Sequence, residues 1–250
     1  MTKFQKMIYL KFEVKYMTKK PVIGVIEWAY QDIDRDPIFE VVRPVVSKVI
    51  KHGGIVRGIF PTQDVDYDQR LRYIPKFTKA ELDELFEQLD QCDAIIKPGA
   101  TKTYEFERHV YEHAVEKDIP FLGICAGMQM MCHYQKERIQ NEKNDPYGME
   151  HHTTRLHPVA IEEDSLLYQI LGVHTIMVNS FHNTHVLDSG VLVPCAYSQD
   201  GLIEAVEHPD CRFSLGVQWH PESMNDRSSD LLFEGLVEAA DITKTLTKKK

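Results

Sequence analysis

Long apolar runs are absent from the sequence. No stretch approaches the roughly 20 consecutive apolar residues that a membrane-spanning helix needs, so we expect no membrane partner. The Lys-rich beginning of the chain lacks both an unbroken apolar stretch of about 7–15 residues and a small-residue cleavage site, and a signal peptide is therefore not expected. Internal repeats and low-complexity tracts are absent too, which leaves an ordinary globular protein as the expectation.

Cysteine pairs with the spacing of disulfide or metal motifs are also lacking. The five cysteines are odd in number and irregularly spaced, and no Cys-x-x-Cys occurs. A disulfide framework is thus not expected, and the cytoplasm, a reducing compartment, is the predicted location.

Positive charge is scarce as well, because 29 Lys and Arg stand against 38 Asp and Glu, a net charge of −9. Since phosphate binding needs clustered Lys and Arg, nucleic acid is not the expected partner.

The chain is long enough for a real hydrophobic core. It has 250 residues, of which 43% are hydrophobic, and no convincing linker divides it, so one domain over residues 21–243 is favoured. Residues 1–20 contain six lysines and are interpreted as an extra edge strand, a tail or the product of an upstream start codon. Residues 244–250 are interpreted as a basic tail.

Short apolar runs alternate with helical patterns through the first half of the chain. The expected strands are 21–26, 55–60, 94–96 and 119–124, and the expected helices are 39–52, 103–117, 126–135 and one that follows Thr78. This order predicts right-handed crossovers and a parallel sheet. Further strands are expected at 155–162, 174–179, 191–197, 201–207 and 212–219, before a last helix at 228–240. The predicted fold is a single α/β domain with a central, mostly parallel sheet flanked by helices, plus a smaller mixed or antiparallel strand region in the second half.

The most informative stretch is Gly123-Ile-Cys-Ala-Gly127, which lies between an apolar strand pattern and a helical pattern. It predicts a strand–nucleophile elbow–helix, the cysteine counterpart of the Gly-x-Ser-x-Gly motif. The sharp turn lifts the nucleophile above the carboxyl edge of the sheet, strains its backbone and requires small residues two positions before and after it. Cys125 then lies at a helix N-terminus, which favours the thiolate, and the N–H of Ala126 is free to bind an oxyanion. The alternative is a glycine-flanked cysteine that is buried for structural reasons alone.

A general base is predicted in Gly216-Val-Gln-Trp-His-Pro-Glu222. Apolar residues alternate with polar or small residues up to His220, which predicts a strand. Pro221 cannot continue the hydrogen-bond ladder of a sheet, so the chain is expected to leave the sheet there. His220 and Glu222 are two residues apart, so in an extended segment their side chains point the same way. A carboxylate on one imidazole nitrogen leaves the other nitrogen to face a thiol, which is the arrangement that an activated nucleophile needs.

These motifs carry a family resemblance. The chain resembles the class I glutamine amidotransferase-like superfamily, and in particular the γ-glutamyl hydrolase branch that includes γ-glutamyl-γ-aminobutyrate hydrolase. The match rests on the segments 97–100, 123–129 and 216–222 in the family's order, together with Val178-Asn-Ser-Phe-His182, which is typical of the hydrolase branch. The spacing is compatible across roughly residues 21–240.

The resemblance implies a site and a reaction. It implies a triad of Cys125, His220 and Glu222 and an oxyanion hole formed by the backbone N–H groups of Gly99 and Ala126. The residues implied to bind the γ-glutamyl group are Gln129, Asn179, Ser180, Phe181 and His182, although Asn179 and His182 could equally be structural. The implied activity is hydrolysis of a small-molecule γ-glutamyl amide through a thioester, with no metal or organic cofactor.

The chain departs from the family pattern at three places. The oxyanion loop has Ala100 where a second glycine is usual, which is tolerable unless that residue needs positive φ. Residues 134–147 are charged and lack the usual Gly-Gly turn, and Asn183-Thr184 follows His182 where His-Gln is common. These changes leave the triad intact and leave the substrate class open.

Other functions remain open on the sequence alone. A glutaminase subunit would use the same triad and pass ammonia to a separate synthetase partner, and a non-enzymatic binding protein could use the same scaffold. The leaving amine and the oligomeric state, a homodimer included, are not determined.

A metal-dependent hydrolase is the remaining alternative. His109 and His113 are four residues apart on an expected helix, and His151, His152 and His157 are close in sequence. No His-Glu-x-x-His occurs, and the first pair is expected on a solvated helix face, so no metal is predicted.

Overall fold

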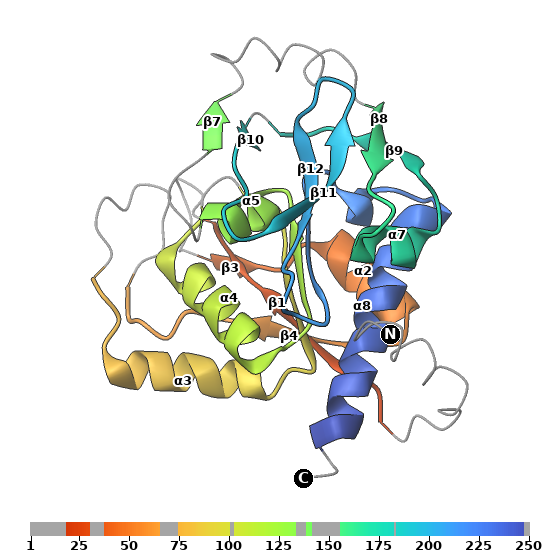
Figure 1. Cartoon of the computed structure of the whole chain (residues 1–250). Coiled ribbons are helices and arrows are strands. Elements are labelled where there is room, and N and C mark those ends of the chain that lie inside the picture. The colour runs from red at the N-terminus through yellow and green to blue at the C-terminus, as the bar shows by residue number, and fades with distance from the viewer. Residues whose placement is uncertain are drawn as a thin grey trace.

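The fold is built on one large sheet (Figure 1). A computed structural model of the chain describes residues 19–30, 38–65, 75–100, 103–133, 139–141, 156–182 and 184–247. The sheet has nine strands in the order β4-β1-β5-β6-β13-β12-β11-β8-β9. Most of the 1–20 extension, the segment 134–147 except for 139–141, Asn183 and the histidines at 151 and 152 lie outside the described residues.

The first five strands of this order are parallel, as the alternating pattern predicts for the four from the first half; β13, which was expected in the mixed or antiparallel region, is parallel to β6. They are β4 (Ile55–Ile59), β1 (Val22–Ile26), β5 (Ala94–Lys97), β6 (Phe121–Ile124) and β13 (Ser214–Val217). Four of them come from the first half of the chain, while β13 comes from near its end and lies beside β6. Because the carboxyl ends of parallel strands share one edge, the segments that follow β5, β6 and β13 meet there.

The strands of the second half continue the same sheet. They are β12 (Ile203–Glu207), β11 (Val193–Ser198), β8 (Leu156–Ile161) and β9 (Thr175–Asn179), and each pairs antiparallel with its neighbour. Since β12 also pairs antiparallel with β13, the parallel and antiparallel parts form one mixed sheet. The prediction of one α/β domain is confirmed, and the antiparallel region is an extension of the central sheet.

Helices cover both faces of the sheet (Figure 1). One face packs against α2 (Arg43–Lys51), α7 (Leu166–Leu171) and α8 (Arg227–Thr247), and the other against α3 (Lys79–Asp90), α4 (Glu105–Lys117) and α5 (Ala126–His133). Successive residues of a strand contribute to opposite faces, as strand geometry requires. In β5, for example, Ile95 belongs to the core under α3 and α4, whereas Ile96 belongs to the core under α2 and α8. No helix within the described ranges is both long enough and apolar enough to span a membrane.

Several boundaries differ from the sequence prediction. The expected helix 39–52 begins only at Arg43, because Ile38–Glu40 forms strand β3 in a hairpin with β2 (Trp28–Tyr30). Helix α8 continues to Thr247, past the expected end at 240 and into the expected basic tail, since no Gly or Pro interrupts that stretch. Helix α7 was not predicted, and neither was the small pair β7 (Ile139–Asn141) and β10 (Thr184–Val186).

Candidate active site

Cys125 lies at the sharp turn between β6 and α5, and its backbone is strained. Its φ is +51°, a left-handed conformation that residues other than glycine rarely adopt. Its N–H donates a hydrogen bond of 2.7 Å to the Val217 carbonyl, which ties the elbow to β13. A Cβ at Gly123 would come within 2.8 Å of the Gly127 carbonyl carbon, and one at Gly127 would overlap the Lys97 carbonyl. The expected strain and the need for small residues on both sides of Cys125 are therefore present.

The imidazole of His220 and the carboxylate of Glu222 approach Cys125 from β13. The register pairs Val217 with Ile124, so the segment after β13 leaves the sheet beside the elbow. His220 Nδ1 is 2.7 Å from Glu222 Oε1, and the Cys125 thiol group lies close enough to the ring to be one of the groups that raise the pKa of His220. Glu222 is buried in the 3₁₀ helix η2 (Pro221–Ser223). The fold thus brings the hydrogen-bonded His220–Glu222 pair beside Cys125, about 95 residues earlier in the sequence.

The ionisation of His220 follows from its two partners. Burial of the ring acts to lower its pKa, but the neighbouring Cys125 thiol group and the hydrogen-bonded Glu222 carboxylate outweigh it, so the pKa of His220 rises from 6.5 to about 10. At neutral pH the ring is then an imidazolium. A cation of this kind beside a thiol favours the thiolate, the form that attacks carbonyl carbon.

Gly99 and Ala126, the predicted oxyanion donors, lie on two sides of Cys125. A Cβ added at Gly99 would be 2.7 Å from His220 Cε1 and 3.4 Å from Cys125 Cβ, so only a glycine lets the loop approach this closely. Ala126 is the first residue of α5, where backbone N–H groups have no partner within the helix. Among the described residues other than glycine, only Cys125 and Asp118 have positive φ, so Ala100 does not need the conformation that a glycine would favour.

Gln218, which the sequence reasoning did not single out, also faces the sulfur. Its side-chain Nε2 is 3.6 Å from Cys125 Sγ, and its Oε1 accepts a hydrogen bond of 3.1 Å from Gln129 Nε2. Gln129 also donates to the Thr184 carbonyl, 2.9 Å away, and accepts from the Thr184 hydroxyl at 3.0 Å. The Gln129 amide, predicted to bind substrate, is thus held by β10 and in turn orients Gln218 toward the sulfur.

The segment 179–182 lies next to His220. The Asn179 amide donates to the His220 carbonyl at 2.9 Å and accepts from the His220 N–H at 2.7 Å, so it holds the backbone of that residue. Phe181 is 57% exposed, and its ring centroid is 5.9 Å from that of His220. Ser180 is buried, with no hydrogen-bond partner for its hydroxyl in the described part of the chain, and His182 Nδ1 is 3.0 Å from the Thr184 carbonyl. Their contacts with substrate remain predictions.

Of the histidines considered as metal ligands, His109 and His113 have other partners. His113 is buried rather than solvated as expected, because it stacks on Phe86 and contacts Asp90 Oδ1 at 2.8 Å. His109 instead contacts Glu112 of its own helix at 3.1 Å. Within the described ranges, no group of three or more His, Cys, Asp or Glu side chains could hold a metal ion.

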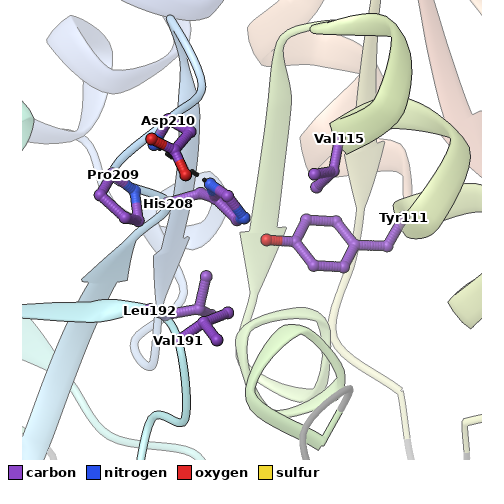
Figure 2. Close-up of a pocket in the computed structure, with 7 residues that line it drawn as sticks. All are labelled: Tyr111, Val115, Val191, Leu192, His208, Pro209 and Asp210. Carbon is purple, nitrogen blue, oxygen red and sulfur yellow. Dashed lines mark hydrogen bonds between the residues drawn. The ribbon is translucent and has the colours of Figure 1, made fainter.

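A pocket of about 230 Å³ lies away from these residues (Figure 2). It is lined by Tyr111, Val115, Val191, Leu192, His208, Pro209 and Asp210. His208 and Asp210 precede β13, whereas His220 follows it, so the pocket is at the opposite edge of the parallel strands. It does not include any of the predicted site residues.

Comparisons with known proteins identify the family of the chain. The Peptidase C26 family model matches residues 91–222. A glutamine amidotransferase-like protein of Rickettsia prowazekii is 29% identical over 90% of this chain and 99% of its own length. The γ-glutamyl-γ-aminobutyrate hydrolase PuuD of Escherichia coli is 34% identical over 50% of this chain, and the match spans 56% of that protein.

The fold has known counterparts as well. The glutaminase domain of Trypanosoma brucei CTPS, solved with bound acivicin, superposes with a TM-score of 0.63 at 19% identity and covers 88% of this chain and 93% of that one. A family model that covers more than half of the chain, the matching relatives and the shared α/β architecture lead to one assignment. The chain belongs to the Peptidase C26 family, within the class I glutamine amidotransferase-like group of cysteine hydrolases and amidotransferases.

Proposed function

We propose that the protein is a cysteine hydrolase that cleaves γ-glutamyl amide bonds with Cys125 as nucleophile, His220 as acid and base, and Glu222 as the group that orients His220. The observation that carries the proposal is the hydrogen-bonded His220–Glu222 pair beside a cysteine at a strained strand-to-helix turn. A buried structural cysteine needs neither the left-handed backbone nor an imidazolium beside it.

The first half of the reaction forms a thioester. The Cys125 thiolate attacks the γ-carbonyl carbon, and the carbonyl oxygen becomes an oxyanion that accepts hydrogen bonds from the N–H groups of Gly99 and Ala126. As the C–N bond breaks, His220 gives its Nε2 proton to the departing amine nitrogen. Glu222 holds Nδ1 at 2.7 Å, so the nitrogen that transfers the proton is fixed.

The second half releases glutamate. His220, now neutral, takes a proton from water, and the resulting hydroxide attacks the thioester carbon. The tetrahedral oxyanion uses the same two N–H groups, and its collapse expels the Cys125 thiolate beside the imidazolium. The cycle returns the starting ion pair and requires no cofactor.

The position of Phe181 is evidence for a leaving group larger than ammonia. The amine must be near His220 to receive its proton, and the exposed Phe181 ring lies against that imidazole. An apolar surface there contributes to binding of a carbon chain on the amine, whereas ammonia gains nothing from it. We therefore favour a γ-glutamyl derivative of an alkyl amine, and the 34% identity to PuuD, which is named for such a substrate, supports this choice.

A glutaminase that delivers ammonia to a synthetase partner is the second candidate. It is favoured by the 27% identity to CTP synthase of Chlamydia trachomatis over 72% of this chain. All five cysteines are free, which supports a cytoplasmic location for either enzyme. The solution mass of the purified protein tests whether it forms a homodimer.

A substrate panel distinguishes these functions. The purified protein is incubated with γ-glutamyl-γ-aminobutyrate, γ-glutamyl alkylamides and glutamine, and released glutamate is measured. We expect turnover of the γ-glutamyl amides by the protein alone and its loss in Cys125→Ala. Turnover of glutamine but of none of the other γ-glutamyl amides favours the glutaminase. Absence of all turnover, or undiminished turnover in Cys125→Ala, contradicts the proposed hydrolase.

A further inference from the structure

A buried ion pair lies beneath the predicted oxyanion loop. Lys97 ends β5 and Glu107 is in the first turn of α4, and each is only 1% exposed. Lys97 Nζ is 3.3 Å from Glu107 Oε1. Glu107 Oε2 also accepts a hydrogen bond of 3.2 Å from the Tyr104 N–H, which fixes the carboxylate in the capping box of α4. The ammonium group is therefore held from one side by a rigid helix terminus.

Stability alone is a weak reason for such a pair. Taking two charges out of water is costly, and well-packed apolar residues of similar volume are often equally stable or more so. Burial raises the pKa of Glu107, and the Lys97 ammonium only partly offsets this effect. The position of the pair, directly before the Pro98–Gly99 peptide, points to a role in the site.

The Lys97 ammonium also binds the peptide that carries the predicted oxyanion donor. Lys97 Nζ donates a hydrogen bond of 3.1 Å to the Pro98 carbonyl oxygen. No peptide bond in the described ranges is cis, and in a trans peptide the C=O and the next N–H point in opposite directions. Holding the Pro98 carbonyl toward Lys97 therefore directs the Gly99 N–H away from Lys97.

The backbone of Lys97 restricts the loop from the other side. A Cβ at Gly127 would overlap the Lys97 carbonyl, so β5 packs directly on the first turn of α5. Gly99 in turn lies against His220 Cε1 and Cys125 Cβ. The hydrogen bond from Lys97 to the Pro98 carbonyl opposes rotation of the Pro98–Gly99 peptide plane.

We propose that Lys97, held in place by Glu107, is a positioning residue that fixes the Pro98–Gly99 peptide plane so that the Gly99 N–H stabilises the oxyanion. This role rests on the proposed hydrolase function. It requires that loss of the ammonium group slows both tetrahedral steps without weakening substrate binding or the reactivity of the thiolate.

The test compares turnover with alkylation in the same variants. Lys97→Met removes the hydrogen bond to Pro98, and the double variant Lys97→Met/Glu107→Gln removes it without leaving a buried carboxylate unpaired. With γ-glutamyl-p-nitroanilide as substrate, we expect kcat to fall about 10- to 100-fold in both variants, since loss of a whole oxyanion donor costs about 10²–10³, while KM stays within about twofold. Alkylation of Cys125 by iodoacetamide displaces iodide without forming an oxyanion, and its rate should not change.

A control variant separates this role from general destabilisation. Arg212→Met removes another ion pair, Arg212 Nε to Asp118 Oδ2 at 2.7 Å, before the amino end of β13. We expect it to lower Tm with kcat unchanged. A folded double variant with wild-type kcat overturns the positioning role, and so does a parallel fall of kcat and alkylation rate. Wild-type protein that is alkylated at Cys125 but hydrolyses no γ-glutamyl amide overturns the hydrolase function and the oxyanion role with it.

Discussion

Replacement of Gly99 by alanine tests the close approach of the oxyanion loop to the imidazole. The new Cβ would be 2.7 Å from His220 Cε1, whereas ordinary van der Waals contact begins at 3.4 Å. Gly99 has no positive φ, so the alanine is not strained by its backbone, and the clash with the ring is the main effect. Either the ring or the loop must give way.

The magnitude follows from this overlap. The ring must retreat by about 0.7 Å, and a misplacement of about 1 Å in a catalytic group costs on the order of 100-fold. We expect kcat/KM of Gly99→Ala to fall between about 10- and 100-fold, with little change in Tm. The loss comes from displacement of the ring from its place between Glu222, 2.7 Å from its Nδ1, and the neighbouring Cys125 thiol group.

The assay is steady-state hydrolysis of a γ-glutamyl amide, with Ala100→Gly as the matched control. That change alters the neighbouring residue of the same loop without adding an atom near the ring, so its kcat/KM should stay close to wild type. Wild-type kcat/KM in Gly99→Ala would refute the placement of the ring against the loop. An equal loss of kcat/KM in Ala100→Gly would show that a change in loop flexibility, and not the clash with the ring, lowers activity.

Three further predictions concern the groups around the sulfur and the ring. Glu222→Gln removes one of the partners that raise the pKa of His220 to about 10. The protonated ring is present below this pKa and is lost as pH rises through it, so the alkaline limb of the profile of kcat/KM against pH should move to lower pH. An unmoved limb would show that Glu222 does not raise the pKa of His220. Asn179→Ala removes two hydrogen bonds to the backbone of His220, so kcat should fall roughly tenfold with KM unchanged, whereas a rise in KM alone would assign Asn179 to substrate binding. Gln218→Leu removes the amide that faces the sulfur and should slow alkylation of Cys125 by iodoacetamide at neutral pH severalfold; an unchanged rate would show that Gln218 does not stabilise the thiolate.

The elbow and its position could be predicted from the sequence because they depend on the size of residues next to one another in the chain. Gly123 and Gly127 are small because any Cβ would collide with the turn, and that need leaves a pattern in consecutive residues. The parallel strands were accessible for a similar reason, since each is a short apolar run between turn signals. The parallel pairing of β13 with β6, which brings His220 to Cys125, was not predicted, because residues 212–219 were expected in the mixed or antiparallel region.

The supporting residues could not be found in this way. Lys97 and Glu107 are ten residues apart in sequence, and Gln218 is 93 residues from Cys125, so only the folded register brings these side chains together. Asn179 was found by its motif, but its amide is bound to the His220 backbone, which no pattern within the motif indicates. Such contacts form only when separate segments meet at the edge of the folded sheet, so no single segment of the sequence predicts them.

The most direct measurement is to trap the covalent intermediate. The protein is mixed with γ-glutamyl-p-nitroanilide, quenched in acid within the first turnovers and digested, and the acylated peptide is identified by mass spectrometry. We expect a γ-glutamyl group on Cys125, absent from Cys125→Ala and accumulating more slowly in Glu222→Gln. A γ-glutamyl group on any other residue, or full turnover by Cys125→Ala, would contradict the cysteine mechanism.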